Sequence, residues 1–301
     1  MKKRIIALLL CVAMLFSGCA KAPENPVTPP FYKITDTNSG GVAYLLGTMH
    51  VGLPNTVYPQ SVYDALSQSD ALVVEVDLIA LDNDKKRLSE AMKLLECSEK
   101  STKEMLGADY ERTRDFFKGK RLYNAVFERY IPAVWSSTLT TKLAEECGYS
   151  SDYGTDRALL SYAKEHTLSI RELESVEEQY SINANESEAL QVYALVSSVD
   201  TAWETQKQQT RNLYENWSRG DIVALEQMIH EDEPPAELAK DYEDFYFAMY
   251  ENRQRNMAEY ISEALKNGET IFVAVGALHL AASPDILELL EIEGYKIEKI
   301  A

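Results

Sequence analysis

The sequence is poor in histidine, in cysteine and in positive charge. Its 301 residues include four histidines and four cysteines, and 30 Lys and Arg stand against 48 Asp and Glu, which gives a net charge of -18. A surface of that sign repels polyanions and anionic membranes. We therefore expect no nucleic-acid partner, and the position of each histidine becomes informative.

The cysteines are too few for a disulfide framework or a cysteine-rich metal cluster. Two of the four lie within the first 19 residues, so only Cys97 and Cys147 remain for the rest of the chain. These two lack Cys-x-x-Cys spacing. A single disulfide, which an exported protein can form, and two unpaired thiols are both compatible with the sequence.

Beyond the N-terminus, no run of apolar residues approaches the 18 or so that a membrane span needs. The first residues combine a basic start with an apolar stretch from Ile5 to Phe16, which is typical of a signal peptide. The sequence Leu-Phe-Ser-Gly-Cys then resembles a bacterial lipobox ending at Cys19. We predict removal of residues 1–18, lipid attachment to Cys19, and an extracytoplasmic protein anchored to the cell membrane. An ordinary signal peptide cut near the same place is the alternative.

A proline-rich segment follows the lipobox. Residues 19–30 contain Pro23, Pro26, Pro29 and Pro30, a composition that predicts an extended tether. The remaining residues, 31–301, are enough for one large domain.

Strand patterns gather at the two ends of this domain. Residues 31–34 and 42–46 flank a Gly-rich turn at 38–41, which predicts a hairpin. Residues 71–76 and 270–275 are apolar runs of strand length, and weaker patterns cover 168–173 and 294–300. Helical patterns dominate between them. We predict an α/β fold with a central mixed sheet, built from the N- and C-terminal strands, and a large helical middle segment.

Two of the expected strands end in the same motif. Residues 44–50 read YLLGTMH and residues 273–279 read VAVGALH, so His50 and His279 each stand three residues after a glycine. Glycine permits a sharp turn, and ligands bind at the carboxyl ends of strands in such sheets. We interpret both histidines as candidate metal ligands or catalytic groups. The alternative is that each is a polar residue with structural partners only.

A carboxylate ends a third expected strand. Glu75 follows the apolar run that begins at Ala71, and an unpaired carboxylate there would be costly. It either forms a salt bridge or helix cap, or it faces the same crevice as His50 and His279. Two histidines and one carboxylate suit Zn, Mn, Fe or Co with open positions for substrate. We expect a divalent metal, Mn, Co or Zn, without choosing among them.

These segments resemble the TraB/GumN family, also called Tiki-like. The similar blocks are YLLGTMHVG, YPQSVYDALSQSDALVVEVDL and IFVAVGALHLAASPDILELLEIEGYKIEKI, and the match runs from about residue 31 to the end. YGTD at 153–156, LESVEEQ at 173–179 and RQRNMA at 253–258 also look like family blocks, although Gln254 stands where the family usually has asparagine. The resemblance implies an erythromycin-esterase/ChaN-like α/β fold.

The resemblance also implies functional roles. Animal members of the family are described as metal-dependent proteases that cut secreted signalling peptides. The active-site residues of the family carry over to His50, Glu75 and His279. Secondary candidates, which would orient the histidines or stabilise an oxyanion, are Asp156, Glu174 and Arg253; helix caps and surface ion pairs are the alternative for each. Related members bind haem or inhibit peptide pheromones.

Two functional hypotheses follow. The first is a lipid-anchored, metal-dependent hydrolase with a peptide or a small molecule as substrate, a peptidase being the form we expect. In it a metal-bound water would attack the substrate and Glu75 would serve as metal ligand or general base. The second is a non-catalytic lipoprotein that binds haem or sequesters a peptide.

Overall fold

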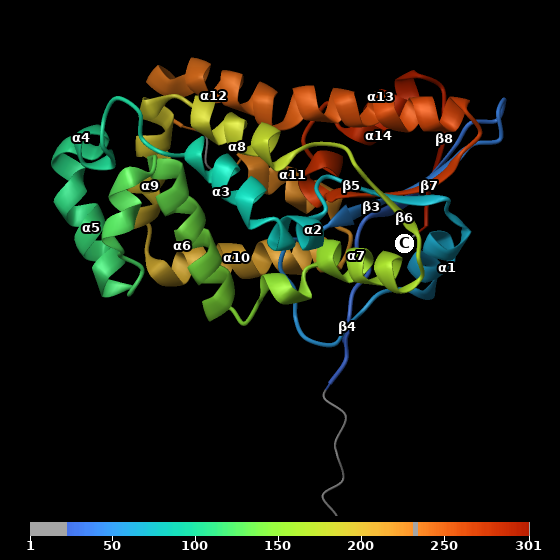
Figure 1. Ribbon diagram of the computed structural model, residues 1–301, viewed down its shortest axis with the longest axis horizontal. Coiled ribbons are helices and arrows are strands. Elements are labelled where there is room, and N and C mark those ends of the chain that lie inside the picture. The colour runs from blue at the N-terminus through green and yellow to red at the C-terminus, as the bar shows by residue number, and fades with distance from the viewer. Residues whose placement is uncertain (1–22, 231–233, 301) are drawn as a thin grey trace, which may run out of the picture.

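A mixed six-stranded sheet forms the centre of the protein. The computed structural model describes residues 23–230 and 234–300 (Figure 1), so the predicted signal peptide and Cys19 lie outside the described residues. The strand order is β6-β5-β7-β3-β2-β8, and β2 runs antiparallel to the other five strands. The predicted α/β class is confirmed. The strands are β2 (Phe31–Thr35), β3 (Val42–Thr48), β5 (Ala71–Val74), β6 (Ser169–Glu172), β7 (Thr270–Gly276) and β8 (Lys296–Lys299).

The three strands in the middle of the sheet are buried on both faces. All four residues of β5 and most of β7 and β3 are inaccessible, which explains why their sequences are continuous apolar runs and not alternating ones. The predicted hairpin is present as β2 and β3, and the lysine-bearing last strand lies at the sheet edge. N- and C-terminal segments thus share one sheet, as the sequence predicts.

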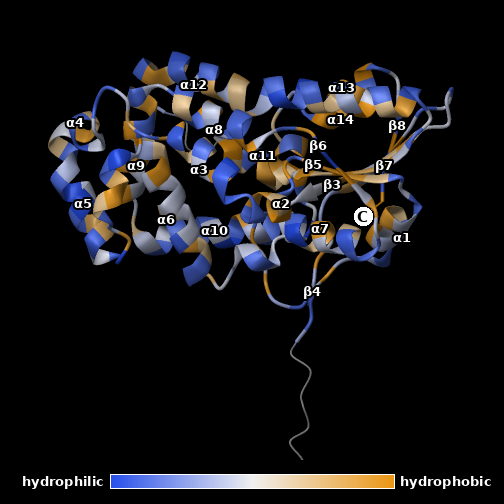
Figure 2. Cartoon of the chain, in the orientation of Figure 1, coloured by the Kyte–Doolittle hydropathy of each residue, from blue (hydrophilic) through white to orange (hydrophobic). Residues whose placement is uncertain are grey.

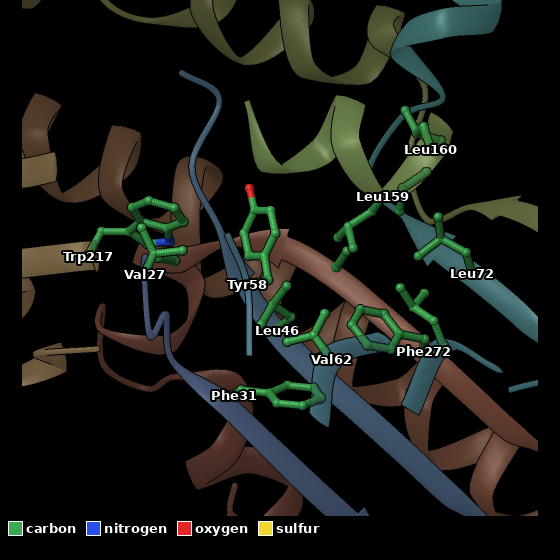
Figure 3. Close-up of a cluster of buried hydrophobic side chains, with 14 of the residues drawn as sticks. Val27, Phe31, Leu46, Tyr58, Val62, Leu72, Leu159, Leu160, Trp217 and Phe272 are labelled. Atoms are coloured by element: carbon green, nitrogen blue, oxygen red, sulfur yellow. The ribbon is translucent and has the colours of Figure 1, made fainter. Parts of the chain in front are cut away.

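Helices cover both faces of the sheet (Figure 1). On one face lie α1 (Gln60–Gln68), α7 (Thr155–Glu165), the end of α10 (Trp203–Ser218) and α11 (Ile222–His230). On the other lie α13 (Asn252–Lys266) and α14 (Ile286–Ile292). Figure 3 shows the first of these two cores, where strand residues Phe31, Leu46 and Phe272 meet side chains from the helices, among them Val62, Leu159 and Trp217.

The predicted helical middle forms a lobe beside the sheet, on the left in Figure 1. Its core surrounds Trp135, whose ring meets Phe117 edge-on with centroids 5.0 Å apart. Hydrophilic and hydrophobic residues alternate along these helices in Figure 2. The lobe comprises α4 (Thr102–Leu106), α5 (Tyr110–Gly119), α6 (Pro132–Glu146) and α9 (Glu188–Asp200). Between lobe and sheet lie α2 (Leu78–Asn83), α3 (Lys85–Lys93) and α8 (Val176–Asn185).

A π-helical turn interrupts the long helix that precedes β7. The helix consists of α12 (Ala239–Tyr246), the π turn Phe247–Glu251 and α13. Such turns are rare in proteins, and those that occur are often found at functional sites. Here the turn ends two residues before Arg253, one of the secondary site candidates.

The described part of the predicted tether packs against the domain. β1 (Asn25–Pro26) pairs with β4 (Thr56–Val57), and Val27 is 5% exposed. Burial of its side chain favours this packing, so the packed body begins before Phe31. Cys97 and Cys147 are both free thiols. None of the described helices is long and apolar enough to cross a membrane.

The hairpin turn provides a test of the packing. An added Cβ at Gly41 would lie 2.2 Å from the carbonyl oxygen of Leu265 in α13, whereas one at Gly119 would meet nothing within 4 Å. We expect Gly41→Ala to lower the free energy of unfolding by about 1–3 kcal/mol, because the hairpin and α13 must separate. Gly119→Ala should leave it unchanged or slightly raised. Denaturant unfolding measures both, and equal effects would contradict this packing.

Candidate active site

The two Gly-x-x-His segments end neighbouring parallel strands. In the register of β3 and β7, Thr48 lies opposite Gly276, so His50 and His279 follow the sheet at the same edge. The backbone is tightly packed here, since an added Cβ on Gly47 would lie 3.1 Å from Ala277. The repeated motif thus marks the place where the two ends of the chain meet.

His50 lies on the open side of this edge. Its Nδ1 is 2.9 Å from Oδ2 of Asp156. The His50 side chain is 67% exposed and that of Asp156 only 10%. The Thr48 hydroxyl donates a hydrogen bond of 2.7 Å to the other oxygen of Asp156. Because the carboxylate fixes the ring through Nδ1, Nε2 is left for another partner.

The turn before Asp156 is pressed against the His50 segment. The Thr155 amide donates to the Met49 carbonyl at 2.9 Å, and an added Cβ on Gly154 would lie 2.4 Å from the His50 carbonyl oxygen. The Asp156 carboxylate takes no part in capping α7. The Gly-Thr-Asp sequence at 154–156 therefore serves to place Asp156 beside His50.

Glu75 belongs to a buried ion-pair cluster at the end of β5. Arg253 Nη2 lies 2.7 Å from Glu75 Oε2, and the guanidinium donates to both oxygens of Glu174 at 2.7 Å. The side chains of Arg253, Glu75 and Glu174 are 10%, 11% and 12% exposed. Gln179 donates to both carboxylates at 3.0 Å. One arginine thus holds two carboxylates that would otherwise repel each other.

Sequence reasoning missed Gln179 as a site residue. Ser175 and Glu178 form a capping box that starts α8 just after β6, and this pattern is visible in the sequence. It places Gln179 on the first turn of the helix. The helix start alone does not reveal which side chains Gln179 meets, because they come from β5 and from the loop after β6.

His279 is the buried histidine of the pair. It is 4% exposed in the short 3-10 turn Ala277–Leu280. Its Nε2 lies 3.9 Å from Glu75 Oε1, which accepts the Gly276 amide hydrogen at 2.6 Å. The Tyr250 ring from the π turn meets it edge-on with centroids 6.0 Å apart. His279 Nδ1 is buried and has no hydrogen-bond partner among the described residues.

Burial and neighbouring charges set the protonation of these groups. Burial lowers the pKa of His279 to about 4, so its ring is neutral at pH 7. Burial would raise the pKa of Glu75, but the charges of His279 and Arg253 outweigh this and lower it to about 2. At the acid pH where Glu75 titrates, His279 is charged. Its charge can therefore lower the pKa of Glu75 even though the ring is neutral at pH 7. The Asp156 carboxylate raises the pKa of His50.

The donor set suits a divalent cation in type and charge. Nδ1 of His50 has the carboxylate partner that metal-ligating histidines use, and His279 is a neutral imidazole next to a carboxylate. A metal ion would bind His50 only in its deprotonated form, and with His50 deprotonated three carboxylates stand against one guanidinium. In residues 23–230 and 234–300, no three His, Cys, Asp or Glu side chains are near enough to surround one ion. Metal binding at this site therefore stays a prediction.

Comparison with known proteins gives one match. The model of the TraB/PrgY/gumN family matches residues 30–299, which includes every residue of the site described above. Neither a curated protein nor a solved structure matches the chain.

The first site prediction concerns Arg253. We expect Arg253→Met to lower the free energy of unfolding by about 3–5 kcal/mol, because it leaves two buried carboxylates without a counter-charge. Arg255 on the same helix is a matched control: its side chain is 55% exposed and pairs with Glu251 at 3.6 Å, so Arg255→Met should change stability by at most about 0.5 kcal/mol. Denaturant unfolding compares the two. Similar losses in both variants would show that the cluster is not a buried ion-pair site.

The second site prediction concerns acid stability. The pKa of His279 is about 4 in the folded protein and about 6.5 in an unfolded chain. Its contribution to stability is therefore complete above pH 6.5 and is lost as the pH falls towards 4, with a slope of about 1.4 kcal/mol per pH unit. In His279→Gln this slope should disappear, whereas His166→Gln, which alters an exposed histidine, should keep it. Unfolding measured with a chelator present tests this, and an unchanged slope in His279→Gln would refute it.

Proposed function

We propose a hydrolytic function for this chain, which belongs to the TraB/PrgY/gumN family. In this proposal the protein is a divalent-metal-dependent hydrolase whose substrate is a peptide. The active site lies at the carboxyl ends of β3, β5 and β7, where ligands bind in sheets of this kind.

One observation carries the proposal. Three strands from distant parts of the chain end at the same edge of the sheet, and each delivers one ionisable side chain there: His50, Glu75 and His279. Placing a carboxylate and two histidines at this edge requires burying Glu75 with its partners Arg253 and Glu174, a costly arrangement for a protein core. Perturbed groups of this kind cluster at functional sites.

The surrounding residues suit a hydrolytic site. Arg253 and the Gly276 amide keep Glu75 ionised, and its Oε1 is the carboxylate oxygen that faces His279. Asp156 holds His50 with Nε2 available. Arg253 is engaged by both carboxylates, which favours an orienting role over the stabilisation of an oxyanion.

The donor types at this edge, two imidazoles and a carboxylate, are those that a divalent cation takes. His50 and His279 would hold it, with Glu75 as a third ligand or as the base beside it. When bound, such an ion polarises a carbonyl group and lowers the pKa of a water molecule. Its charge would also offset the excess of carboxylates.

We place the domain on the outer side of the cell membrane. This part of the proposal rests on the sequence alone: a basic and apolar start followed by a lipobox-like segment at Cys19. A lipid there would hold the domain at the membrane surface without a spanning helix.

Metal uptake by the purified protein tests the proposal. After removal of metal and dialysis against Mn, Co or Zn, we expect one ion per chain. His50→Ala and His279→Ala should each lower the affinity by at least about 10–100-fold with unchanged circular dichroism, whereas the control His166→Ala should bind normally. Metal-loaded protein should cleave members of a peptide library, and Glu75→Gln should not.

The same preparations distinguish the alternative. A Soret band on haem titration that is lost in His50→Ala, without stoichiometric binding of any divalent ion, would favour a haem-binding lipoprotein. Peptide binding without cleavage under all metal conditions would favour a sequestering protein. Either result would overturn the hydrolase proposal.

A further inference from the structure

A cavity of about 450 Å³ lies between the helical lobe and α8, outside the site described above. One wall is α6, and the opposite wall is made of α3 and α8, which lie side by side in Figure 1. The volume is within the range of ligand pockets in proteins, about 300–1,000 Å³. We call it the lobe groove; its lining includes Met92, Val134, Ser137, Tyr180 and Asn183.

The groove is elongated because a whole face of α6 lines it. Its lining residues on this helix run from Ala133 to Glu145 and recur at helical spacing. The opposite face of the helix carries Trp135, Leu139 and Leu143 into the core of the lobe. Twelve residues of helix span about 18 Å, which is the length of about five or six residues of extended chain. The shape fits a short stretch of polymer better than a compact small molecule.

The lining is neutral and mixed in polarity. Met92, Val134 and Tyr180 place half-buried apolar surface on opposite walls. Between them lie neutral polar groups, and the Ser137 and Tyr180 hydroxyls make no hydrogen bond to any described residue. The one lysine of the lining, Lys142, has Glu145 at 3.7 Å. Such a surface offers apolar contacts and hydrogen bonds without a preferred charge, which suits the alternating amides and side chains of a peptide.

The helix α8 borders both the candidate active site and the groove. Gln179 donates to Glu75 at 3.0 Å, and Asn183, four residues later, lines the groove. Residues four apart share one helix face and lie about 6 Å from each other. The Asn183 amide even donates to the Gln179 carbonyl at 3.4 Å. The lobe groove therefore lies about one helical turn along α8 from the Glu75 cluster.

We propose that the lobe groove binds an extended, uncharged segment of a peptide substrate, with apolar side chains against Met92, Val134 and Tyr180. The inference rests on the proposed function in that it names a substrate class for that site. Binding in the groove requires neither a metal ion nor cleavage, so the two proposals can fail separately.

Methionine-methyl NMR on the full-length chain tests the groove directly. With ¹³C-labelled methionine, the Met92 signal is assigned through Met92→Leu. The probes are blocked hexapeptides that alternate Leu or Phe with Ser, and a control set in which Asp or Lys replaces the apolar residues. Metal-free Glu75→Gln protein serves as the background, so that no peptide is cut. From titrations of the Met92 shift, we expect the apolar peptides to bind with an affinity at least about tenfold higher than that of the charged set.

Two matched variants locate the binding. Ser137 and Thr140 are both exposed on α6, but only Ser137 lines the groove. Ser137→Trp should fill the groove and weaken binding of the apolar peptides at least about tenfold, and Thr141→Trp, which alters a second exposed lining residue, should do the same. Thr140→Trp should bind as the parent does.

The outcomes separate the two proposals. Three results would overturn the groove as a peptide site. They are no shift of Met92 with any peptide, equal binding by Ser137→Trp and the parent, and a shift that only an added fatty acid causes. A Met92 shift that Ser137→Trp abolishes, in a protein that takes up no metal and cuts no peptide, would support the groove and refute the hydrolase. In metal-loaded protein that does cut peptides, Ser137→Trp should raise KM and leave kcat and metal affinity unchanged.

Discussion

The guanidinium of Arg253, held between two buried carboxylates, is the interaction on which the rest of the site depends. It joins the end of β5, the loop after β6 and the start of α13, three segments that are far apart in the sequence. Removing an arginine and two carboxylates from water is costly, and only their close mutual contacts offset that cost. With Arg253 bound to both carboxylates, Glu75 stays ionised at the edge of an apolar sheet and faces His279.

The two histidines, although alike in sequence, have opposite surroundings. His50 is largely exposed and leans on a carboxylate that favours its charged form. His279 is buried against Tyr250 and Glu75, and burial favours its neutral form. One edge of the sheet thus offers an open, oriented imidazole and an enclosed, neutral one. This asymmetry follows from the neighbours of each strand: β3 ends next to the turn that carries Asp156, and β7 ends beneath the π turn of the long helix.

The helical middle positions the site and also borders it. α7 supplies Asp156, α8 supplies Gln179, and α10 anchors the end of β3 through a hydrogen bond of 2.9 Å from the Trp217 indole to the Gly47 carbonyl. Because α8 contacts the Glu75 cluster on one turn and the lobe groove on the next, the lobe and the site share one helix.

The sequence by itself determined the α/β class, the six strands of the central sheet and the repeated motif at two strand ends, because apolar runs of strand length and Gly-x-x-His are local patterns. The resemblance of residues 31 to the end to one family brought in Asp156, Glu174 and Arg253. Only the tertiary structure decided that Arg253 bridges Glu75 and Glu174, that Gln179 joins them, and that the two histidines differ in burial. Those facts depend on which strands pair and which helix crosses them, and such contacts between distant residues have no local signal in the chain.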